Sequence, residues 1–195
     1  LDQLHFFHNT PKDLLWKKHL QKNYTFKELA TCMSHLKAIR SAYKNGDDIA
    51  LVLEDDVMLD DRFAETSWNL VSAAPKNWEV LQLYVQHQKM VGHFNHLLDP
   101  WIFWQSKNWA ASAYFINRKG MEKLLQIMYK GPDMFFRTPI VVADEMVYAH
   151  LNSYTSTYPN VRTTGEPSQI QTDKAELTRQ RSRTINTFIY EKASS

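Results

Sequence analysis

Residues 49–53 are Ile-Ala-Leu-Val-Leu, and three acidic residues, Glu54, Asp55 and Asp56, follow them directly. An apolar run of this length, entered through the turn-forming residues Asn-Gly-Asp-Asp at 45–48, is typical of a strand buried on both faces, as in a parallel sheet. Parallel sheets bind ligands beyond the carboxyl ends of their strands. Carboxylates crowded at such an end repel one another unless a cation or hydrogen-bond donors neutralise them. The stretch therefore predicts a metal-diphosphate site at the end of a buried strand.

Length and composition limit the kinds of protein that this chain can be. With 195 residues, of which 44% are hydrophobic, it is long enough for one globular domain with a sizeable core. The net charge of +2 is small and the basic residues are scattered, so no nucleic-acid partner is expected. The chain has no apolar stretch of about 20 residues, and we expect no transmembrane segment in it. A cytoplasmic or peripheral-membrane location is favoured, with the secretory lumen as the alternative if a leader precedes Leu1.

Hydrophobic periodicity and turn signals divide the chain into alternating elements. Strands are predicted at 4–7, 49–53, 78–84 and 110–117, with an extended piece at 154–158, and helices at 11–20, 27–44, 62–73, 121–129 and 144–151. Residues 87–107 show no clear period and are predicted to be irregular. The pattern predicts an α/β domain with a mostly parallel central sheet flanked by helices, as in Rossmann-like folds.

Four blocks of sequence follow one another in an order that is more informative than any one of them. Residues 28–35 are ELATCMSH, residues 50–57 are ALVLEDDV, residues 75–81 are PKNWEVL and residues 113–125 are AYFINRKGMEKLL. In this order the blocks resemble glycosyltransferase family 25, which includes lipooligosaccharide and collagen galactosyltransferases. The first block is similar to the family's Glu-x-Gly-Cys-x-x-Ser-His, with Ala30 in place of Gly and Thr31 in place of Cys. Residues 144–145 and 167–171 fall where later family blocks lie.

The resemblance spans roughly residues 4–173 and implies a domain of the GT-A type. We therefore expect a glycosyltransferase domain at 1–173 and a polar arm or surface helix at 174–195. Members of the family usually open with a further strand and helix that form part of the donor nucleotide site. That opening has no counterpart here, so the expectation is either that residues precede Leu1 or that the nucleotide pocket is built differently.

The resemblance implies transfer of a hexose from a nucleotide-diphosphate sugar, most simply a UDP-sugar, to a glycan or protein-linked acceptor. Such a transfer needs the leaving diphosphate to be neutralised, and carboxylates can hold Mn²⁺ or Mg²⁺ for that purpose. We expect Asp56 to be the metal ligand, together with Glu54. Because side chains alternate along an extended strand, Glu54 and Asp56 would face one site, and Asp55 would point towards ribose or the backbone. The resemblance also implies that Ser34 and His35 lie near the donor, although a lone helical His is more often a core residue.

An inverting transfer needs a base near the acceptor hydroxyl, and two acids in an apolar segment are the candidates. Asp144 and Glu145 follow Ile-Val-Val-Ala at 140–143 and precede Met-Val-Tyr at 146–148. Burial there would raise a carboxylate pKa towards a value useful for catalysis. The alternative is that both acids merely stabilise the positive end of a helix dipole.

Histidine and tryptophan side chains are further candidates for a role in binding. The spacing of His87, His93, His96 and His150 matches no zinc pattern, so structural zinc is not expected. Three tryptophans, Trp101, Trp104 and Trp109, are candidates for stacking on an acceptor sugar, and at least one of them is expected in the core instead.

Two alternative functions remain open on the sequence alone. The first is an inactive nucleotide- or glycan-binding domain that keeps the fold and the three acids but lacks a complete donor pocket. The second is a metal-dependent phosphoryl-transfer domain, which also places acids after a buried strand. Its details fit poorly, because haloacid-type phosphatases need an Asp where this chain has Glu54, and a Thr soon after.

Overall fold

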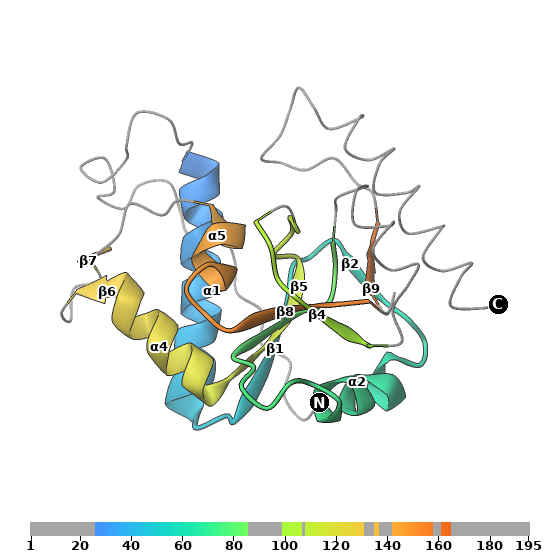
Figure 1. Cartoon of the computed structure of the whole chain (residues 1–195). Coiled ribbons are helices and arrows are strands. Elements are labelled where there is room, and N and C mark those ends of the chain that lie inside the picture. Colours follow the sequence, from blue (N-terminus) through green and yellow to red (C-terminus); the bar gives the residue numbers. More distant parts are fainter. Residues whose placement is uncertain are drawn as a thin grey trace.

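The computed structural model describes residues 26–85, 99–106, 108–130, 135–136, 142–157 and 161–164 (Figure 1). The strand predicted at 4–7, the helix predicted at 11–20 and the C-terminal arm lie outside these residues. Four helices are described: α1 (Phe26–Asn45), α2 (Phe63–Ser72), α4 (Arg118–Met128) and α5 (Ala143–Tyr148). They confirm the helices predicted at 27–44, 62–73, 121–129 and 144–151, with shifts of a few residues at some ends.

The main sheet has five strands, and most of its pairings are antiparallel. In spatial order they are β1 (Ile49–Leu53), β5 (Ala113–Asn117), β3 (Val80–Gln82), β8 (Ser153–Ser156) and β4 (Trp101–Phe103). Only β3 and β8 pair in parallel. The α/β class is therefore confirmed, whereas the prediction of a mostly parallel sheet is wrong.

The reason for the error is the position of β5. Strands β1, β3 and β8 do run in the same direction, as helical crossovers between them require. However, β5 lies between β1 and β3 and runs the opposite way, pairing with both. The carboxyl ends of β1, β3 and β8 consequently still lie at one end of the sheet, beside the amino end of β5.

Two further pairs of short strands complete the structure. Strand β2 (Val57–Leu59) pairs with β9 (Val161–Thr163), and β6 (Tyr129–Lys130) pairs with β7 (Phe135–Phe136), both antiparallel. Strand β4 falls within the stretch predicted to be irregular, which corrects that prediction for its residues. Strands β3 and β5 are shorter than the predicted runs at 78–84 and 110–117.

Helices cover both faces of the sheet and form two cores. On one face α1, α4 and α5 pack on side chains such as Val80, Tyr114 and Ile116, and on the other α2 packs on Leu81 and Phe115 (Figure 1). The alternation along β3 and β5 is the period of two expected of strands. Both faces of β1 are covered as predicted, but β1 lies at the sheet edge, and among its residues only Val52 is fully buried.

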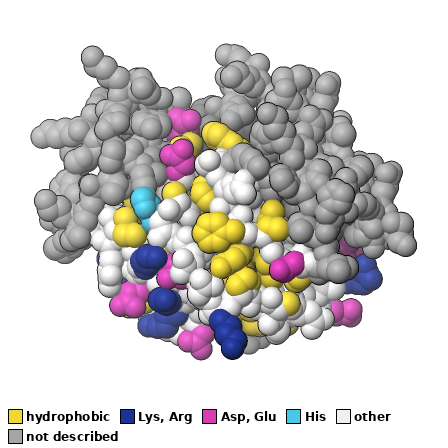
Figure 2. Space-filling model, viewed as in Figure 1, with side chains coloured by type: hydrophobic (Ala, Val, Ile, Leu, Met, Phe, Trp, Pro, Cys, Tyr) yellow, Lys and Arg dark blue, Asp and Glu magenta, His cyan; other side chains and the backbone are white. Residues whose placement is uncertain are grey.

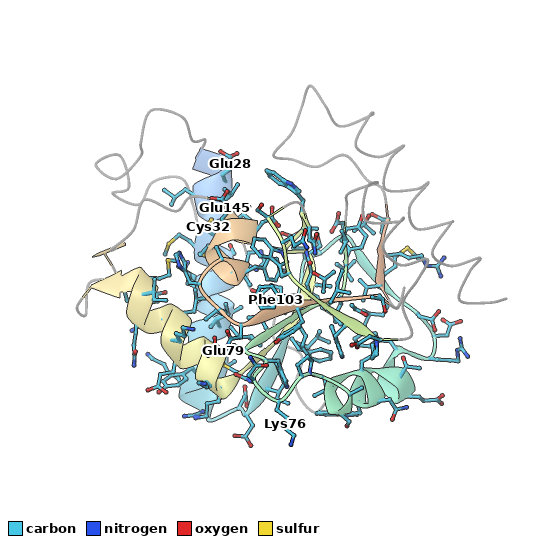
Figure 3. All side chains as sticks on the ribbon, viewed as in Figure 1. Glu28, Cys32, Lys76, Glu79, Phe103 and Glu145 are labelled. Atoms are coloured by element: carbon cyan, nitrogen blue, oxygen red, sulfur yellow. The ribbon has the colours of Figure 1, made fainter. Side chains whose placement is uncertain are left out.

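A buried carboxylate joins helix α4 to the amino ends of β3 and β8. Glu79 accepts hydrogen bonds from Lys123 Nζ and the N–H of Asn152, both at 2.9 Å, and Lys119 Nζ lies 3.6 Å from its other oxygen (Figure 3). Burial by itself would raise the pKa of Glu79, but the Asn152 N–H and the two ammonium groups hold it below its usual range. This carboxylate is fully paired and therefore structural.

Helix α4 approaches the same point closely enough to require glycine. A Cβ placed on Gly120 would lie 2.5 Å from the carbonyl oxygen of Glu79, which belongs to the backbone and moves only with the sheet. The side chain of Asn117 caps this helix by accepting a hydrogen bond from the Gly120 N–H at 2.8 Å.

We expect Gly120→Ala to lower the free energy of unfolding by about 3 kcal/mol or more, because the new methyl group must displace sheet backbone. Gly46→Ala is the matched control: Gly46 has φ +88°, but a Cβ there meets nothing within 4 Å. Its cost should be backbone strain alone, about 1–2 kcal/mol. Urea unfolding of both variants measures the difference, and a Gly120→Ala protein as stable as Gly46→Ala would contradict this packing.

Candidate active site

Polar side chains gather at the end of the sheet that contains the carboxyl ends of β1, β3 and β8. Glu79 lies at the opposite end. Glu54 directly follows β1, Gln82 ends β3, and Ser112 directly precedes β5. The N–H of Glu54 donates to the carbonyl oxygen of Ser112 at 2.8 Å, which continues the pairing of the two strands by one residue. The sheet itself therefore fixes the positions of Glu54 and Ser112.

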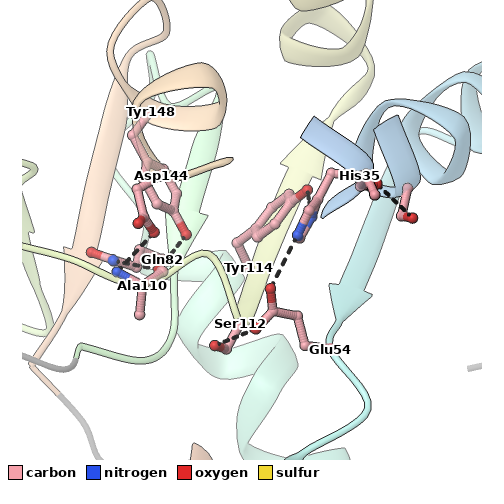
Figure 4. Close-up of polar contacts among 10 residues, drawn as sticks. His35, Glu54, Gln82, Ala110, Ser112, Tyr114, Asp144 and Tyr148 are labelled. Atoms are coloured by element: carbon pink, nitrogen blue, oxygen red, sulfur yellow. Dashed lines mark hydrogen bonds and ion pairs between the residues drawn. The ribbon is translucent and has the colours of Figure 1, made fainter. Parts of the chain in front are cut away.

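Glu54 is the first of two carboxylates held at this end of the sheet. Its Oε2 accepts a hydrogen bond from the Ser112 hydroxyl at 2.7 Å, and its Oε1 lies 3.3 Å from His35 Nε2 (Figure 4). The other ring nitrogen of His35 lies 3.0 Å from the Tyr114 hydroxyl, and the two rings stack with centroids 5.7 Å apart. Burial by itself would raise the pKa of Glu54, but His35 and Ser112 hold it below its usual range. Glu54 is therefore ionised at neutral pH.

Asp144 is the second carboxylate, and its environment has the opposite effect. It lies in the first turn of α5, where its Oδ1 accepts a hydrogen bond from the N–H of Ala110 at 2.9 Å. Burial raises the pKa of Asp144 to about 6, and the negative charges of Glu54 and Glu145 add to this, although the Ala110 N–H and His35 act against it. Asp144 is thus a weaker acid than an ordinary aspartic acid, and its ionised form a stronger base.

The backbone that Asp144 contacts is strained and held from several sides. Ala110 has φ +120°, a conformation that residues other than glycine rarely adopt. Its carbonyl oxygen accepts hydrogen bonds from Gln82 Nε2 at 2.8 Å and from the Tyr148 hydroxyl at 3.0 Å (Figure 4). Such strain costs about 1–3 kcal/mol and persists only where the surroundings determine it, most often at functional sites.

Buried amide and hydroxyl groups support the same segment from beneath. Gln82 Nε2 also donates to the carbonyl oxygen of Asn108 at 2.9 Å, and its Oε1 accepts from the Thr155 hydroxyl at 2.8 Å. Asn108 Nδ2 in turn donates to Thr155 Oγ1 at 2.9 Å. The residues on either side of position 109 are therefore locked in place by side chains from β3 and β8.

An aromatic pair connects the surroundings of the two carboxylates. The rings of Tyr114 and Tyr148 meet edge to face with centroids 6.0 Å apart. Tyr114 contacts His35 on the Glu54 side, whereas Tyr148 contacts Ala110 on the Asp144 side (Figure 4). The charge of Glu54 contributes to the raised pKa of Asp144, so the two carboxylates belong to one electrostatic unit.

The acids after Glu54 form a turn and do not continue the strand. The N–H of Val57 donates to the carbonyl oxygen of Glu54 at 3.4 Å, and β2 begins at that residue. The expectation that Glu54, Asp55 and Asp56 alternate along an extended strand is therefore wrong. After the turn, β2 pairs with β9 in a separate two-stranded sheet and does not extend the main sheet.

Asp56 has an oxygen that fits a hard divalent cation. Its Oδ1 is buried and has no hydrogen-bond partner in the described part of the chain. Burial, followed by the charges of Glu54 and Asp55, raises the pKa of Asp56 to about 6.

Both oxygens of Glu54, by contrast, already accept hydrogen bonds. Among the described residues no three His, Cys, Asp or Glu side chains lie close enough to hold a metal by themselves. A cation at Asp56 would therefore need ligands beyond these side chains, and substrate phosphate oxygens are ligands that Mg²⁺ commonly takes.

Comparison with known families identifies the class of protein. Residues 3–146 match the family model described as "Glycosyltransferase family 25 (LPS biosynthesis protein)", which covers most of the chain. The chain belongs to glycosyltransferase family 25. This confirms the resemblance inferred from the four sequence blocks.

The remaining comparisons add little to the family assignment. No curated protein matches this family 25 chain. One solved structure with a match is described as "Crystal Structure of A197 from STIV"; it is 13% identical over 69% of this chain, with a TM-score of 0.36. This chain spans 64% of the length of that structure's chain. Within the described residues, no helix has the length and apolar character needed to cross a membrane.

The other residues predicted for the site of this family 25 protein are spread around it. The Ser34 hydroxyl donates to the carbonyl oxygen of Ala30 within α1 at 3.0 Å. Asp55 and Glu145 are exposed, and Glu145 follows Asp144 on α5. Of the histidines, His87, His93 and His96 lie outside the described residues, whereas His150 follows α5 and its Nε2 is buried without a partner among the described residues.

The three tryptophans have three different environments. Trp101 is buried in the core with its indole N–H donating to Leu70 on α2, and Trp104 is half-buried against Tyr148. Only Trp109 among the three is exposed. The expectation that at least one of them belongs to the core is confirmed by Trp101.

Sequence reasoning missed four polar residues of the site: Gln82, Asn108, Ser112 and Tyr114. They carry no charge and match no catalytic motif, and residues 110–117 were interpreted as an ordinary apolar strand. The available signal was the spacing of Ser112 and Tyr114, which are two residues apart and so face the same side of β5. Their partners Glu54 and His35 are distant in the sequence.

For the metal-free protein we expect Asp56→Asn to be more stable than wild type at pH 7.5, by about 1–2 kcal/mol. The native protein keeps a proton on Asp56 up to about pH 6, whereas the ordinary pKa is 3.8, so wild-type stability should fall as pH rises between these values. At about pH 3 the difference should vanish, since Asp56 is then mostly neutral in both states. Urea unfolding at both pH values measures it, with the exposed Asp61→Asn as control; an equal difference at both values would contradict the burial of Asp56.

Proposed function

We propose that this family 25 protein is a metal-dependent hexosyltransferase of the GT-A type. It moves a hexose from a nucleotide-diphosphate sugar, most simply a UDP-sugar, to a glycan or protein-linked acceptor with inversion at the anomeric carbon. The observation that carries the proposal is the pair of coupled carboxylates, Glu54 and Asp144, whose pKa values are shifted in opposite directions. Opposed shifts at one site commonly separate an acid-base group from a permanently charged one.

Asp144 is the base in this proposal. Its Oδ1 accepts the N–H of Ala110, and no described residue donates to Oδ2, which leaves that oxygen for an acceptor hydroxyl. With a pKa of about 6 the carboxylate is ionised at pH 7.5, yet it binds a proton more readily than an ordinary Asp. As the acceptor oxygen attacks the anomeric carbon, Asp144 takes the hydroxyl proton and the nucleotide diphosphate leaves with the bonding electrons. Glu145, exposed beside Asp144, contributes negative charge that supports the raised pKa.

Asp56 is the metal ligand in this proposal, with Mn²⁺ or Mg²⁺ as the ion. A cation bound to its buried Oδ1 would neutralise the repulsion among the three acids and the charge of the leaving diphosphate. Glu54 contributes negative charge from the neighbouring position, and its remaining lone pairs can still accept a ligand or a ribose hydroxyl. Asp55, Ser34 and His35 are assigned to the donor side, with His35 positioning Glu54 through the 3.3 Å contact.

Asp56 can be tested by ligand-dependent stability, which requires no turnover. Saturating UDP with Mn²⁺ should raise the Tm of wild type by about 5–10 °C, and much less without Mn²⁺. The Asp56→Asn variant should lose the Mn²⁺-dependent part, whereas the exposed Asp61→Asn control should keep it.

The alternatives predict other outcomes in the same experiment. A shift with UDP that is independent of Mn²⁺ and of Asp56 would favour a metal-free nucleotide-binding domain. No shift with UDP or with any other nucleotide diphosphate would favour a glycan-binding domain without a donor site.

The base is tested by paired substitutions at Asp144. In Asp144→Asn the amide oxygen can still accept the Ala110 N–H, so the protein should fold and bind UDP normally, while kcat for UDP release from a UDP-hexose falls by about 10²–10⁴. Asp144→Ala should lose both the rate and part of the stability, because the Ala110 N–H is left buried without an acceptor.

The wild-type rate should rise with pH through about 6 as Asp144 ionises, and it should level off above that. Glu145→Gln is the matched control on the same helix turn and should retain most of the rate. Asp144→Asn with a wild-type rate would contradict the assignment of the base.

A further inference from the structure

Trp109 is an exposed aromatic side chain within a buried part of the chain. Its side chain is 49% exposed, whereas Asn108 before it and residues 110–116 after it are buried. Placing a large apolar ring in water is unfavourable, and folding normally removes such a ring from solvent. The exposure of Trp109 therefore calls for a cause in the surrounding structure.

The backbone on both sides of Trp109 is held in place by buried side chains. The Asn108 side chain is bonded to Thr155, and the carbonyl oxygens of Asn108 and Ala110 both accept hydrogen bonds from Gln82. Ala110 is held at φ +120° by these bonds and by Asp144. Several buried groups thus maintain a strained segment whose one exposed member, from 108 to 116, is an indole.

The backbone of Trp109 lies next to Asp144, the candidate base. The carbonyl carbon of Trp109 is bonded to the nitrogen of Ala110, and that N–H donates to Asp144 Oδ1 at 2.9 Å. The Cα of Trp109 therefore lies within roughly 5 Å of the Asp144 carboxylate. The Trp109 side chain therefore extends from a backbone position next to the group proposed to accept the proton of the acceptor hydroxyl.

We propose that Trp109 is the stacking platform for the acceptor, and that the acceptor presents a hexopyranose ring. One face of such a ring carries C–H groups that pack on an aromatic surface, while its rim carries the hydroxyls that react. This inference rests on the proposed function, because it gives Asp144 a hydroxyl to deprotonate. Stacking orients the sugar ring, and the locked segment 108–110 fixes the distance between the ring and the base.

Other exposed aromatic side chains lack this combination. Trp68, 58% exposed, lies on α2 on the opposite face of the sheet, and Phe103, 60% exposed, meets Tyr154 edge to face. Figure 2 shows apolar side chains gathered in the middle of one face, where Figure 3 places Phe103. Neither residue is next to a carboxylate with a raised pKa in the described structure, so Trp68 serves as a matched control.

The test measures sugar binding separately from donor binding. Saturation-transfer NMR with lactose, cellobiose and maltose, which present galactose and glucose rings in α and β linkage, is recorded with UDP and Mn²⁺ present. Wild type and Trp68→Ala should bind at least one disaccharide. Trp109→Phe should retain binding, and Trp109→Ala should weaken it at least about tenfold, because the stacking surface is gone. All variants should keep the wild-type Tm within about 2 °C, since the side chain is exposed.

The outcomes separate the platform from the proposed function. Trp109→Ala that binds the disaccharides like wild type would overturn the platform, and so would a wild type that binds none of the three. If UDP and Mn²⁺ do not raise the Tm of wild type, but sugar binding still depends on Trp109, the hexosyltransferase proposal is overturned and the protein is a glycan-binding domain. A raised apparent KM for the disaccharide acceptor with little change in kcat in Trp109→Ala, and a nearly unchanged KM in Trp109→Phe, would further support the platform.

Discussion

The pairing of β5 with β1 on one side and β3 on the other is the constraint on which the rest of the structure depends. Because β5 runs against both neighbours, its amino end meets their carboxyl ends, and this brings Ser112 and Tyr114 beside Glu54. At its other end Asn117 caps α4, which packs close to Glu79 through Gly120. One short strand therefore positions the candidate active site at one end of the sheet and the contact between Gly120 and Glu79 at the other.

Carboxylates at the two ends of the sheet's strands have contrasting environments. Glu79 is surrounded by two ammonium groups and a backbone N–H, and its low pKa reflects complete pairing. At the opposite end of the sheet, Asp56 and Asp144 are partly buried with few donors, and both have a pKa raised to about 6. Buried charge without a partner lowers stability, so the protein gains nothing from these two acids unless a ligand, cation or proton transfer makes use of them. The contrast supports separating Glu79 from the residues proposed to act in sugar transfer.

The segment 108–110 also contains features that lower stability. Ala110 has a strained backbone, and Trp109 exposes its indole to solvent. A network of buried amides and hydroxyls is needed to hold the segment in this conformation. Together they fix the backbone from which the Trp109 side chain extends, next to Asp144. The proposed transfer would benefit from such rigidity, because misplacement of about 1 Å can cost a hundredfold in rate.

The sequence by itself determined the elements and the family. Residues 49–53 form the expected strand, and the apolar periods at 27–44, 62–73 and 121–129 form helices. The order of four blocks identifies family 25. Local periodicity and the order of motifs can both be recognised without knowing which distant residues meet. Only the tertiary structure decided the direction of β5, the turn after Glu54 and the grouping of Ser112, Tyr114 and Gln82 around two carboxylates. These depend on pairings between residues far apart in the chain, such as His35 with Tyr114 and Glu54 with Ser112. A carboxylate's pKa is set by burial and by such distant neighbours, so the sequence could name the acids but not distinguish the strong from the weak.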